Sequence, residues 1–279
     1  MLAGIIIGIL VLILVLWVWL IAPGRGADFG ELEKFDYAHR GLHDLSIGVP
    51  ENSAKAFARA VEKGYGIELD LQLTKDDKVV VHHDNSLKRS CGEEKLISDL
   101  TFEELQEYRI FGTEERIPTF AEVLKIMGGK TPMIVELKGY NDTARLCTLA
   151  MRELDAYKGL YCVESFDPRI VRWFKKNRPE IIRGQLMYWL KPGERITPKP
   201  LSRFEAFAAR NLLTNFYTRP HFEAYDIDAH ARHSMLSLKL AKSICGMKEV
   251  SWTLRSDADL DFAKRLNALR IFEKVEPKN

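Results

Sequence analysis

Residues Ala38–Ser53 read AHRGLHDLSIGVPENS and place a histidine and an arginine directly after a short apolar run. Residues Ile67–Asp84 read IELDLQLTKDDKVVVHHD and combine a Glu-x-Asp pair with a closing His-His-Asp. Side chains two residues apart on a strand point to the same face, so the two carboxylates of the second stretch should face one common space. Polar groups that recur at the ends of successive strands indicate a functional site.

Outward from these two stretches, apolar runs of strand length alternate with helical patterns along the chain. This order predicts an α/β fold of the (β/α)8 TIM-barrel class. An open doubly wound sheet is the alternative, and the absence of a GxGxxG motif after the first strand disfavours it. The expected strands are Phe35–Ala38, Ile67–Leu71, Val79–His82, Met133–Leu137, Tyr161–Ser165, Ile182–Met187, Phe222–Ile227 and Glu249–Leu254.

In such a barrel the carboxyl ends of the strands meet at one mouth, where the polar groups of successive strands come together. The first four expected strands contribute, in order, His39 with Arg40, Glu68 with Asp70, His82 with His83, and Glu136 with Lys138. An acidic barrel interior would be costly without a bound cation. The joint occurrence of these pairs therefore favours a catalytic mouth over four unrelated solvated charges.

The residue types at this mouth predict a particular chemistry. Glu68, Asp70 and Glu136 offer only oxygen ligands, which suit a divalent cation such as Mg²⁺ or Ca²⁺. Arg40 and Lys138 suit a phosphate group. Two histidines at opposite sides suit a general base and a general acid. Together these groups predict metal-assisted cleavage of a phosphodiester.

The N-terminal segment Gly4–Ala22 reads GIIIGILVLILVLWVWLIA and carries no charge. At about 1.5 Å per residue this helix nearly spans a hydrocarbon core of about 30 Å. We expect residues 1–25 to form a retained single-pass anchor that enters the membrane through residues 4–22. A cleaved signal peptide is the alternative, disfavoured by the missing basic n-region and A-x-A site. Basic residues after the span favour a cytoplasmic catalytic domain under the positive-inside rule.

Composition limits the remaining function classes. The chain has 41 basic and 39 acidic residues and a formal net charge of +2, so no nucleic-acid partner is expected. The four cysteines form no CxxC motif and are expected to be free thiols rather than disulfides or zinc ligands. They are Cys91, Cys147, Cys162 and Cys245.

Four motifs resemble the glycerophosphodiester phosphodiesterase family. They are HRG at 39–41, PENS at 50–53, the run from Ile67 to Arg89, and IVELK at 134–138. Weaker similarity continues through VESFDP, GQL and SWTLRS to IFEKVEP, which ends at Pro277. The resemblance implies one TIM-barrel domain over residues 26–279. It also implies hydrolysis of glycerophosphodiesters to an alcohol and glycerol 3-phosphate with a divalent cation.

The same resemblance implies roles for individual residues. These are Glu68, Asp70 and Glu136 as metal ligands, His39 and His83 as the catalytic pair, Arg40 and Lys138 as phosphate contacts, Glu51 and Asn52 as part of the site wall, and Phe166 and Trp252 as aromatic positions near the substrate. His83 matches the family histidine, and strand alternation then turns His82 away from the mouth. The last strand ends in IFE where many members have ITD, so no functional residue is expected there.

Several functions remain open at this point. The anchor would hold the site beside a bilayer, so lysophospholipids are expected as substrates as well as deacylated glycerophosphodiesters. A phospholipase-D-like or sphingomyelinase-D-like lyase would release a cyclic phosphate through similar groups, and barrel phospholipases of inositol lipids are related. A catalytically silent, membrane-tethered binding domain is the non-enzymatic alternative. It is disfavoured because every proposed ligand and both histidines are present.

Overall fold

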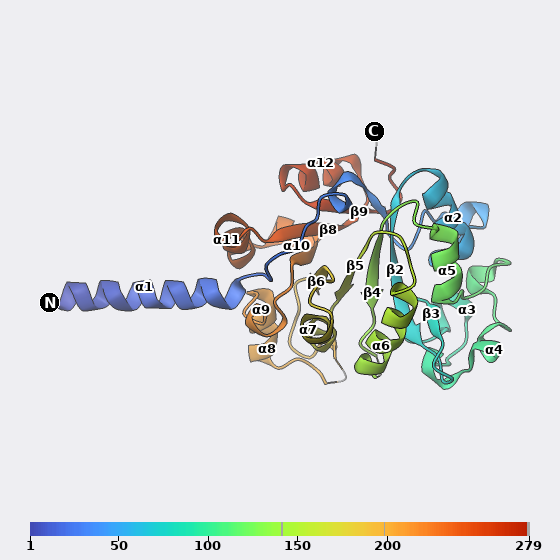
Figure 1. The fold of residues 1–279 in the computed structure, drawn as a ribbon, viewed down its shortest axis with the longest axis horizontal. Helices are drawn as coiled ribbons and strands as arrows, with labels where there is room; N and C mark the ends of the chain where they lie inside the picture. Colours follow the sequence, from blue (N-terminus) through green and yellow to red (C-terminus); the bar gives the residue numbers. More distant parts are fainter. Residues whose placement is uncertain (141, 198, 278–279) are drawn as a thin grey trace.

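Eight parallel strands close into a barrel in the computed structural model, which describes residues 1–140, 142–197 and 199–277 (Figure 1). β1 pairs with β2 on one side and with β9 on the other, and this double pairing closes the sheet. The predicted TIM barrel is therefore confirmed. The barrel strands are β1 (Tyr37–Ala38), β2 (Gly66–Leu73), β4 (Met133–Leu137), β5 (Tyr161–Ser165), β6 (Arg183–Met187), β7 (Phe222–Asp226), β8 (Lys248–Leu254) and β9 (Leu269–Phe272).

The third expected strand is not part of the barrel wall. β3 (Val79–Val81) runs antiparallel to β2, with Val81 opposite Leu71, so the TKDDK turn closes a hairpin. The eighth wall strand is instead β9, a run of four residues that includes Arg270 and was not among the expected strands. The expected number of strands was correct, but it counted β3 in place of β9.

Helices cover the outside of the barrel between consecutive strands (Figure 1). Capping boxes at Thr101, Thr119 and Ser202 satisfy the first backbone N–H groups of three of them. The helices are α2 (Ala54–Glu62), α3 (Lys88–Cys91), α4 (Phe102–Leu105), α5 (Phe120–Met127), α6 (Thr143–Leu154), α7 (Pro168–Asn177), α8 (Arg203–Arg210), α9 (Asn215–Thr218), α10 (Ile227–Arg232), α11 (Leu236–Cys245) and α12 (Asp257–Arg265). Short 3-10 turns add η1 (Leu32–Lys34), η2 (Leu45–Ile47), η3 (Ile97–Asp99) and η4 (Ile110–Gly112).

Alternation along the strands divides the core into two layers. On β2 the apolar residues Ile67, Leu69 and Leu71 pack with residues of the surrounding helices, such as Phe57 and Phe120. Glu68, which alternates with them, lies on the opposite face. A second apolar layer includes Tyr37, Ile134, Leu186, Ala224 and Val250. All four cysteines are free as expected, and Cys147 and Cys162 are buried.

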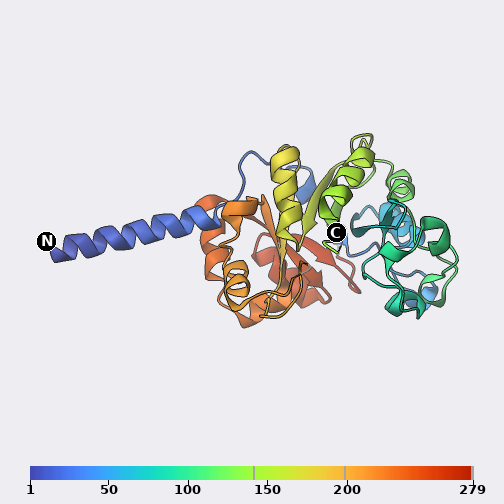
Figure 2. The same ribbon diagram turned by 90° about the horizontal axis from the view of Figure 1, so that it is seen from below.

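The connection from β3 to α5 forms a small lobe with its own core. Val80, Leu87, Ile97, Leu105 and Ile110 are buried against one another there. Figure 2 shows this lobe on the side of the barrel opposite the N-terminal helix. The lobe carries the loop that follows β3, and this loop reaches the carboxyl end of the barrel, where the N–H of His82 donates to the carbonyl oxygen of Asp70.

The N-terminal helix α1 (Leu2–Ile21) projects from the barrel as a single straight rod (Figures 1 and 2). It is long and apolar enough to cross a membrane, a test that a signal sequence also passes. Its last turn is docked: Ile21 is fully buried beside Met187 and Leu190. Arg219 donates from Nη1 to the carbonyl oxygens of Trp19 at 2.7 Å and Ala22 at 2.9 Å. These bonds satisfy carbonyl groups that a helix end otherwise leaves unpaired.

Two N-terminal truncations are expected to differ in stability. Removal of residues 1–16 deletes exposed turns and keeps the docked Ile21, whereas removal of residues 1–25 leaves a cavity where Ile21 was packed. We expect the longer truncation to lower the free energy of unfolding by about 2–5 kcal/mol relative to the shorter one. Urea unfolding followed by circular dichroism measures the difference. Coincident transitions would show that the docked turn does not stabilise the barrel.

Candidate active site

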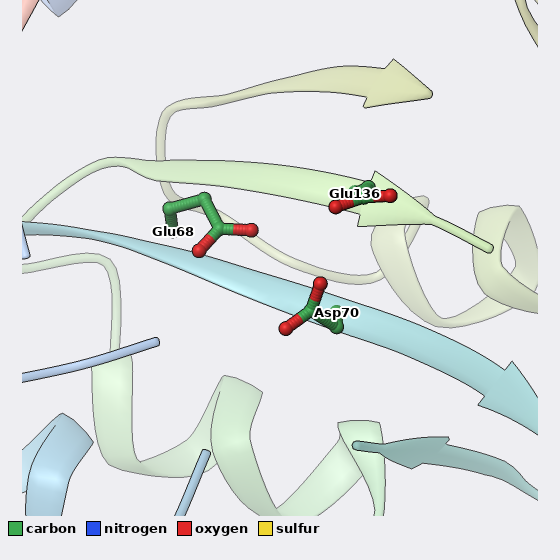
Figure 3. Close-up of side chains that lie close together, drawn as sticks. All are labelled: Glu68, Asp70 and Glu136. Atoms are coloured by element: carbon green, nitrogen blue, oxygen red, sulfur yellow. The ribbon is translucent and has the colours of Figure 1, made fainter. Parts of the chain in front are cut away.

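Three carboxylates converge inside the carboxyl end of the barrel, Glu68 and Asp70 from β2 and Glu136 from β4 (Figure 3). Asp70 and Glu136 are register partners in the parallel pair, and the i, i+2 spacing places Glu68 on the same face as Asp70. One oxygen atom from each residue lies within 4.8 Å of the others, and all three side chains are buried. The structure thus brings together the three acids that the spacing predicted.

Burial and mutual repulsion disturb the titration of these acids. Burial, together with the charges of Asp70 and Glu136, raises the pKa of Glu68 well above its usual range. Burial also raises the pKa of Glu136 to about 7. A buried, oxygen-only cluster whose members resist joint ionisation fits a hard divalent cation, because the positive ion would stabilise all three charges. The donor set therefore fits Mg²⁺ or Ca²⁺.

Lys138 supplies positive charge to two of the three acids. Its Nζ lies 2.7 Å from Asp70 Oδ1 and 2.7 Å from Glu136 Oε2. Burial opposes ionisation of Asp70, but the ammonium of Lys138 leads the charges that hold its pKa well below the usual range. Lys138 also lines the cavity described below, where a positive group suits a phosphate.

The turn after β1 places Arg40 beside the acids. Arg40 and Gly41 have φ angles of 54° and 80°, and a Cβ on Gly41 would lie 2.9 Å from Ala56, so only glycine fits there. The backbone N–H of Arg40 donates to Glu68 Oε2 at 3.1 Å. Its Nη1 donates to Glu51 Oε1 at 2.7 Å. The turn therefore ties the HRG motif to both the acids and the PENS motif.

Glu51 and Asn52, the two residues expected in the site wall, form hydrogen bonds with other residues of the expected site. Asn52 donates from Nδ2 to Asp70 Oδ2 at 2.7 Å. Glu51 accepts from Arg40 and, at 2.7 Å, from Nη2 of Arg89. Burial alone would raise the pKa of Glu51, but these two guanidinium groups lower it to about 2. Arg89, which sequence reasoning did not single out, thus joins the loop after β1 to the loop after β3.

His39 is held by a carboxylate from the last strand. Its Nδ1 lies 3.0 Å from Glu273 Oε2, and its Nε2 lies 3.9 Å from Glu68 Oε2. Burial lowers the pKa of His39 to about 4, so the imidazole is neutral at pH 7. With Nδ1–H donating to Glu273, the Nε2 lone pair is free to accept a proton. The final triplet IFE, to which no function was given, contributes this carboxylate.

His83 has a matching arrangement, with Nδ1 beside a carboxylate. The hairpin folds back so that the N–H of His82 donates to Asp70 O at 3.0 Å, which returns the chain to the level of the carboxylates. His83 Nδ1 lies 2.7 Å from Asp84 Oδ1, and Arg89 donates from Nε to the other oxygen of Asp84 at 2.5 Å. Burial, followed by the charge of Lys138, lowers the pKa of His83.

His82 points away from the mouth, as strand alternation predicted. It is buried, with Nδ1 2.9 Å from the carbonyl oxygen of Asp84 and Nε2 2.9 Å from Ser90 Oγ. These contacts hold the loop that carries His83. The structure therefore gives adjacent histidines two different environments, one facing the acids and one in the core of the lobe.

A cavity of about 480 Å³ opens beside the acids and is large enough for a small phosphodiester. Phe166 lines it and makes edge-to-face contacts with Tyr188 at 5.5 Å and Trp252 at 5.7 Å between ring centroids. Of the two expected aromatic positions, Phe166 faces the cavity and Trp252 supports it. Other lining residues include His83, Glu136, Lys138, Tyr140 and Thr197.

Residues 39–216 match the glycerophosphoryl diester phosphodiesterase family. The chain belongs to this family. A glycerophosphodiester phosphodiesterase from Caldanaerobacter subterraneus subsp. tengcongensis is 37% identical over 161 residues, covering 53% of this chain and 65% of that relative. A lysophospholipase D from Rattus norvegicus is 38% identical over 118 residues, covering 38% of this chain and 36% of that relative. The matched stretches thus span less than two thirds of these relatives' lengths.

Solved structures share the fold of this family member. A glycerophosphodiester phosphodiesterase from Thermotoga maritima has a TM-score of 0.62 at 25% identity, covering 85% of this chain and 93% of its own. A phosphodiesterase from Oleispira antarctica, solved in complex with sn-glycerol-3-phosphate, has a TM-score of 0.66 at 20% identity, covering 85% and 92%. Both likenesses extend over the barrel and agree with its closed topology.

A fourth acid in the barrel of this family member was missed by sequence reasoning. Glu164 on β5 is the register partner of Glu136 and is 2% exposed. Burial, followed by the charge of Glu136, raises its pKa well above the usual range. Its signal in the sequence is the VESFDP motif, in which Glu164 lies two positions before Phe166.

Glu273 is expected to act as a positioning residue for His39. The Glu273→Gln variant keeps an oxygen acceptor for Nδ1–H but removes the charge that favours protonated His39. We expect kcat/KM to fall about 10- to 100-fold, the scale for groups that orient a functional side chain. The acidic limb of the pH profile should move to lower pH, because loss of the carboxylate lowers the imidazole pKa.

Glu276→Gln provides the matched control for this experiment. Glu276 also follows β9, but it is exposed and pairs with Lys63 at 3.1 Å, away from the acids. Its rate and pH profile should equal those of the unmodified protein. An unshifted acidic limb in Glu273→Gln would show that the carboxylate does not act through His39.

Proposed function

We propose that this chain is a metal-dependent phosphodiesterase that hydrolyses glycerophosphodiesters to an alcohol and glycerol 3-phosphate. The observation that carries the proposal is the joint geometry of three buried carboxylates and two histidines, each with Nδ1 bonded to its own carboxylate. Arg40 and Lys138 add positive charge beside the acids. Family membership supports the same reaction.

Glu68, Asp70 and Glu136 would hold the cation, Mg²⁺ or Ca²⁺. When bound, such an ion polarises a phosphoryl oxygen and lowers the pKa of a coordinated hydroxyl. Lys138 and Arg40 neutralise charge that develops on the phosphoryl group. Asn52 and Glu51 hold Asp70 and Arg40 in place for these roles.

The histidines move the protons in two half-reactions. In the first, we assign the base to His39, whose neutral Nε2 lies nearer the acids and takes the proton from the glycerol 2-hydroxyl. The hydroxyl oxygen bonds to phosphorus and gives a cyclic phosphate, while the bond between phosphorus and the alcohol oxygen breaks and His83 protonates the departing alcohol. In the second, His83 takes a proton from water, the water oxygen bonds to phosphorus, and His39 returns its proton to the ring oxygen that leaves. The products are the alcohol and glycerol 3-phosphate.

Turnover of glycerophosphocholine with EDTA, followed by return of Mg²⁺, Ca²⁺ or Mn²⁺, tests the proposal. We expect EDTA to abolish turnover and at least one cation to restore it, with glycerol 3-phosphate as the final product in phosphorus NMR. A cyclic phosphate that accumulates without opening would instead indicate a lyase. Absence of turnover with every cation would overturn the enzymatic assignment in favour of a binding domain.

We further propose that residues 1–25 are a membrane anchor and that residues 26–279 form one catalytic domain. The length and apolarity of α1 support a span through residues 4–22. Basic residues after the span favour the cytoplasmic side for the barrel. Protease digestion of sealed inside-out membrane vesicles tests this orientation. A barrel on the cytoplasmic side would be digested, whereas a barrel on the opposite side would be protected.

A further inference from the structure

A second cavity of about 460 Å³ adjoins the cavity of about 480 Å³ that His83, Glu136 and Lys138 line, which we call the polar cavity. The wall of the second cavity is mostly apolar. We call this second cavity the apolar cavity. Its wall is formed largely by hydrocarbon side chains from β6, α8, α9 and the segment before α8. These include Met187, Ile196, Leu201, Phe204, Ala208 and Leu213. A preformed apolar site of this size favours a hydrocarbon ligand, because water gains few hydrogen bonds there.

The two cavities share part of their wall. Phe166, Ile196 and Thr197 belong to the walls of both. On one side of this shared boundary lie His83, Glu136 and Lys138 with their charges. A molecule that placed a phosphodiester beside Lys138 would therefore direct one of its ends towards the apolar cavity.

The apolar cavity also reaches the C-terminal end of α1. Leu20, near the end of α1, is part of its wall, and Phe216 of α9 is another part. Phe216 stacks on Trp19 of α1, with ring centroids 6.0 Å apart. Phe204 of α8 lines the cavity while remaining 75% exposed. Exposed aromatic side chains beside a spanning helix are typical of the membrane interface.

We propose that the apolar cavity binds the acyl chain of a monoacyl glycerophosphodiester, a lysophospholipid drawn from the membrane that α1 enters. The proposal rests on the proposed function, and it names the substrate class of that site. The phosphodiester lies in the polar cavity, and Phe166, Ile196 and Thr197 contact the substrate where the glycerol meets the chain. α1 then has two roles, as the anchor and as part of the wall beside the acyl chain.

A chain-length series measures this binding directly. The full chain in lipid nanodiscs is assayed with glycerophosphocholine and with hexanoyl, octanoyl and decanoyl lysophosphatidylcholine. Each methylene that enters an apolar site should raise kcat/KM roughly fourfold. A flat series would overturn the acyl-chain site.

Substitutions on α8 separate the cavity from general membrane contact. Ala208→Phe fills the cavity, and we expect the ratio of decanoyl-substrate to glycerophosphocholine kcat/KM to fall at least tenfold. Phe204→Ala removes an exposed part of the wall with little risk to folding and should lower the same ratio severalfold. Phe207→Ala is the matched control, since Phe207 is 51% exposed on the same helix and lies outside the cavity wall. An equal loss in all three variants would indicate membrane contact alone.

A binding measurement keeps this inference distinct from the proposed reaction. Decylphosphocholine is a single-chain phosphodiester without the glycerol hydroxyl, and its binding is followed by tryptophan fluorescence. We expect Ala208→Phe to weaken this binding at least tenfold. If no diester is hydrolysed but this loss is observed, the proposed function fails and the acyl-chain site stands. If glycerophosphocholine is hydrolysed but Ala208→Phe, folded by circular dichroism, binds decylphosphocholine unchanged, the site is wrong.

Discussion

The His39→Ala variant is expected to lose roughly 10²–10⁴-fold in kcat/KM on glycerophosphocholine, the scale of general acid–base catalysis. His39 is neutral at pH 7 and presents Nε2 beside the acids, while Glu273 fixes Nδ1. Alanine removes the proton acceptor without disturbing Glu68 or Arg40. Steady-state kinetics at saturating cation measure the loss, and a rate within a few fold of the unmodified protein would remove His39 from the mechanism.

His82 and His83 supply an internal comparison for this result. His83→Ala should lose rate on the same scale as His39→Ala. His82→Ala should retain most of the rate but lower the free energy of unfolding by about 1–3 kcal/mol, because Ser90 and the carbonyl of Asp84 lose a buried partner. An inactive His82→Ala with an active His83→Ala would mean that the catalytic histidine was assigned one residue out of register.

Asp70→Asn is expected to lower turnover by about 10³-fold, since a bound cation supplies several kcal/mol of charge stabilisation. Asparagine keeps the shape of the side chain and can still accept the hydrogen bond from Asn52. It removes the charge that pairs with Lys138 and that a hard cation needs. High concentrations of the cation should restore part of the rate, which distinguishes weakened metal binding from misfolding.

Asp77→Asn is the matched control for the loss of one carboxylate charge. Asp77 lies in the turn between β2 and β3, where it pairs with Arg145 at the surface. Its φ of 63° suits asparagine as well as aspartate. This variant should retain full activity and full EDTA sensitivity. If Asp70→Asn also kept both, the metal assignment of the acidic cluster would have to be abandoned.

Much of the site follows from local pattern alone. Glu68 and Asp70 share a face because strand side chains alternate along β2. The same alternation separates His83 from His82. The helical conformation of α1 is also determined locally, since Gly4–Ala22 is a continuous uncharged apolar run without proline. These features depend on neighbours a few residues away, which the sequence displays directly.

The remaining features depend on which strands pair and in which direction. β3 and β9 have similar apolar content, yet only β9 completes the barrel, because the short TKDDK turn forces β3 to run antiparallel. The contact of Glu273 with His39 joins residues 234 positions apart and exists only after the barrel closes. Likewise, the apolar cavity takes its wall from α1, β6, α8 and α9 together. Local pattern therefore determined the pair of acids on β2 and the apolar helix α1, whereas strand pairing and closure of the barrel decided the position of Glu136, the partner of His39 and the wall of the apolar cavity.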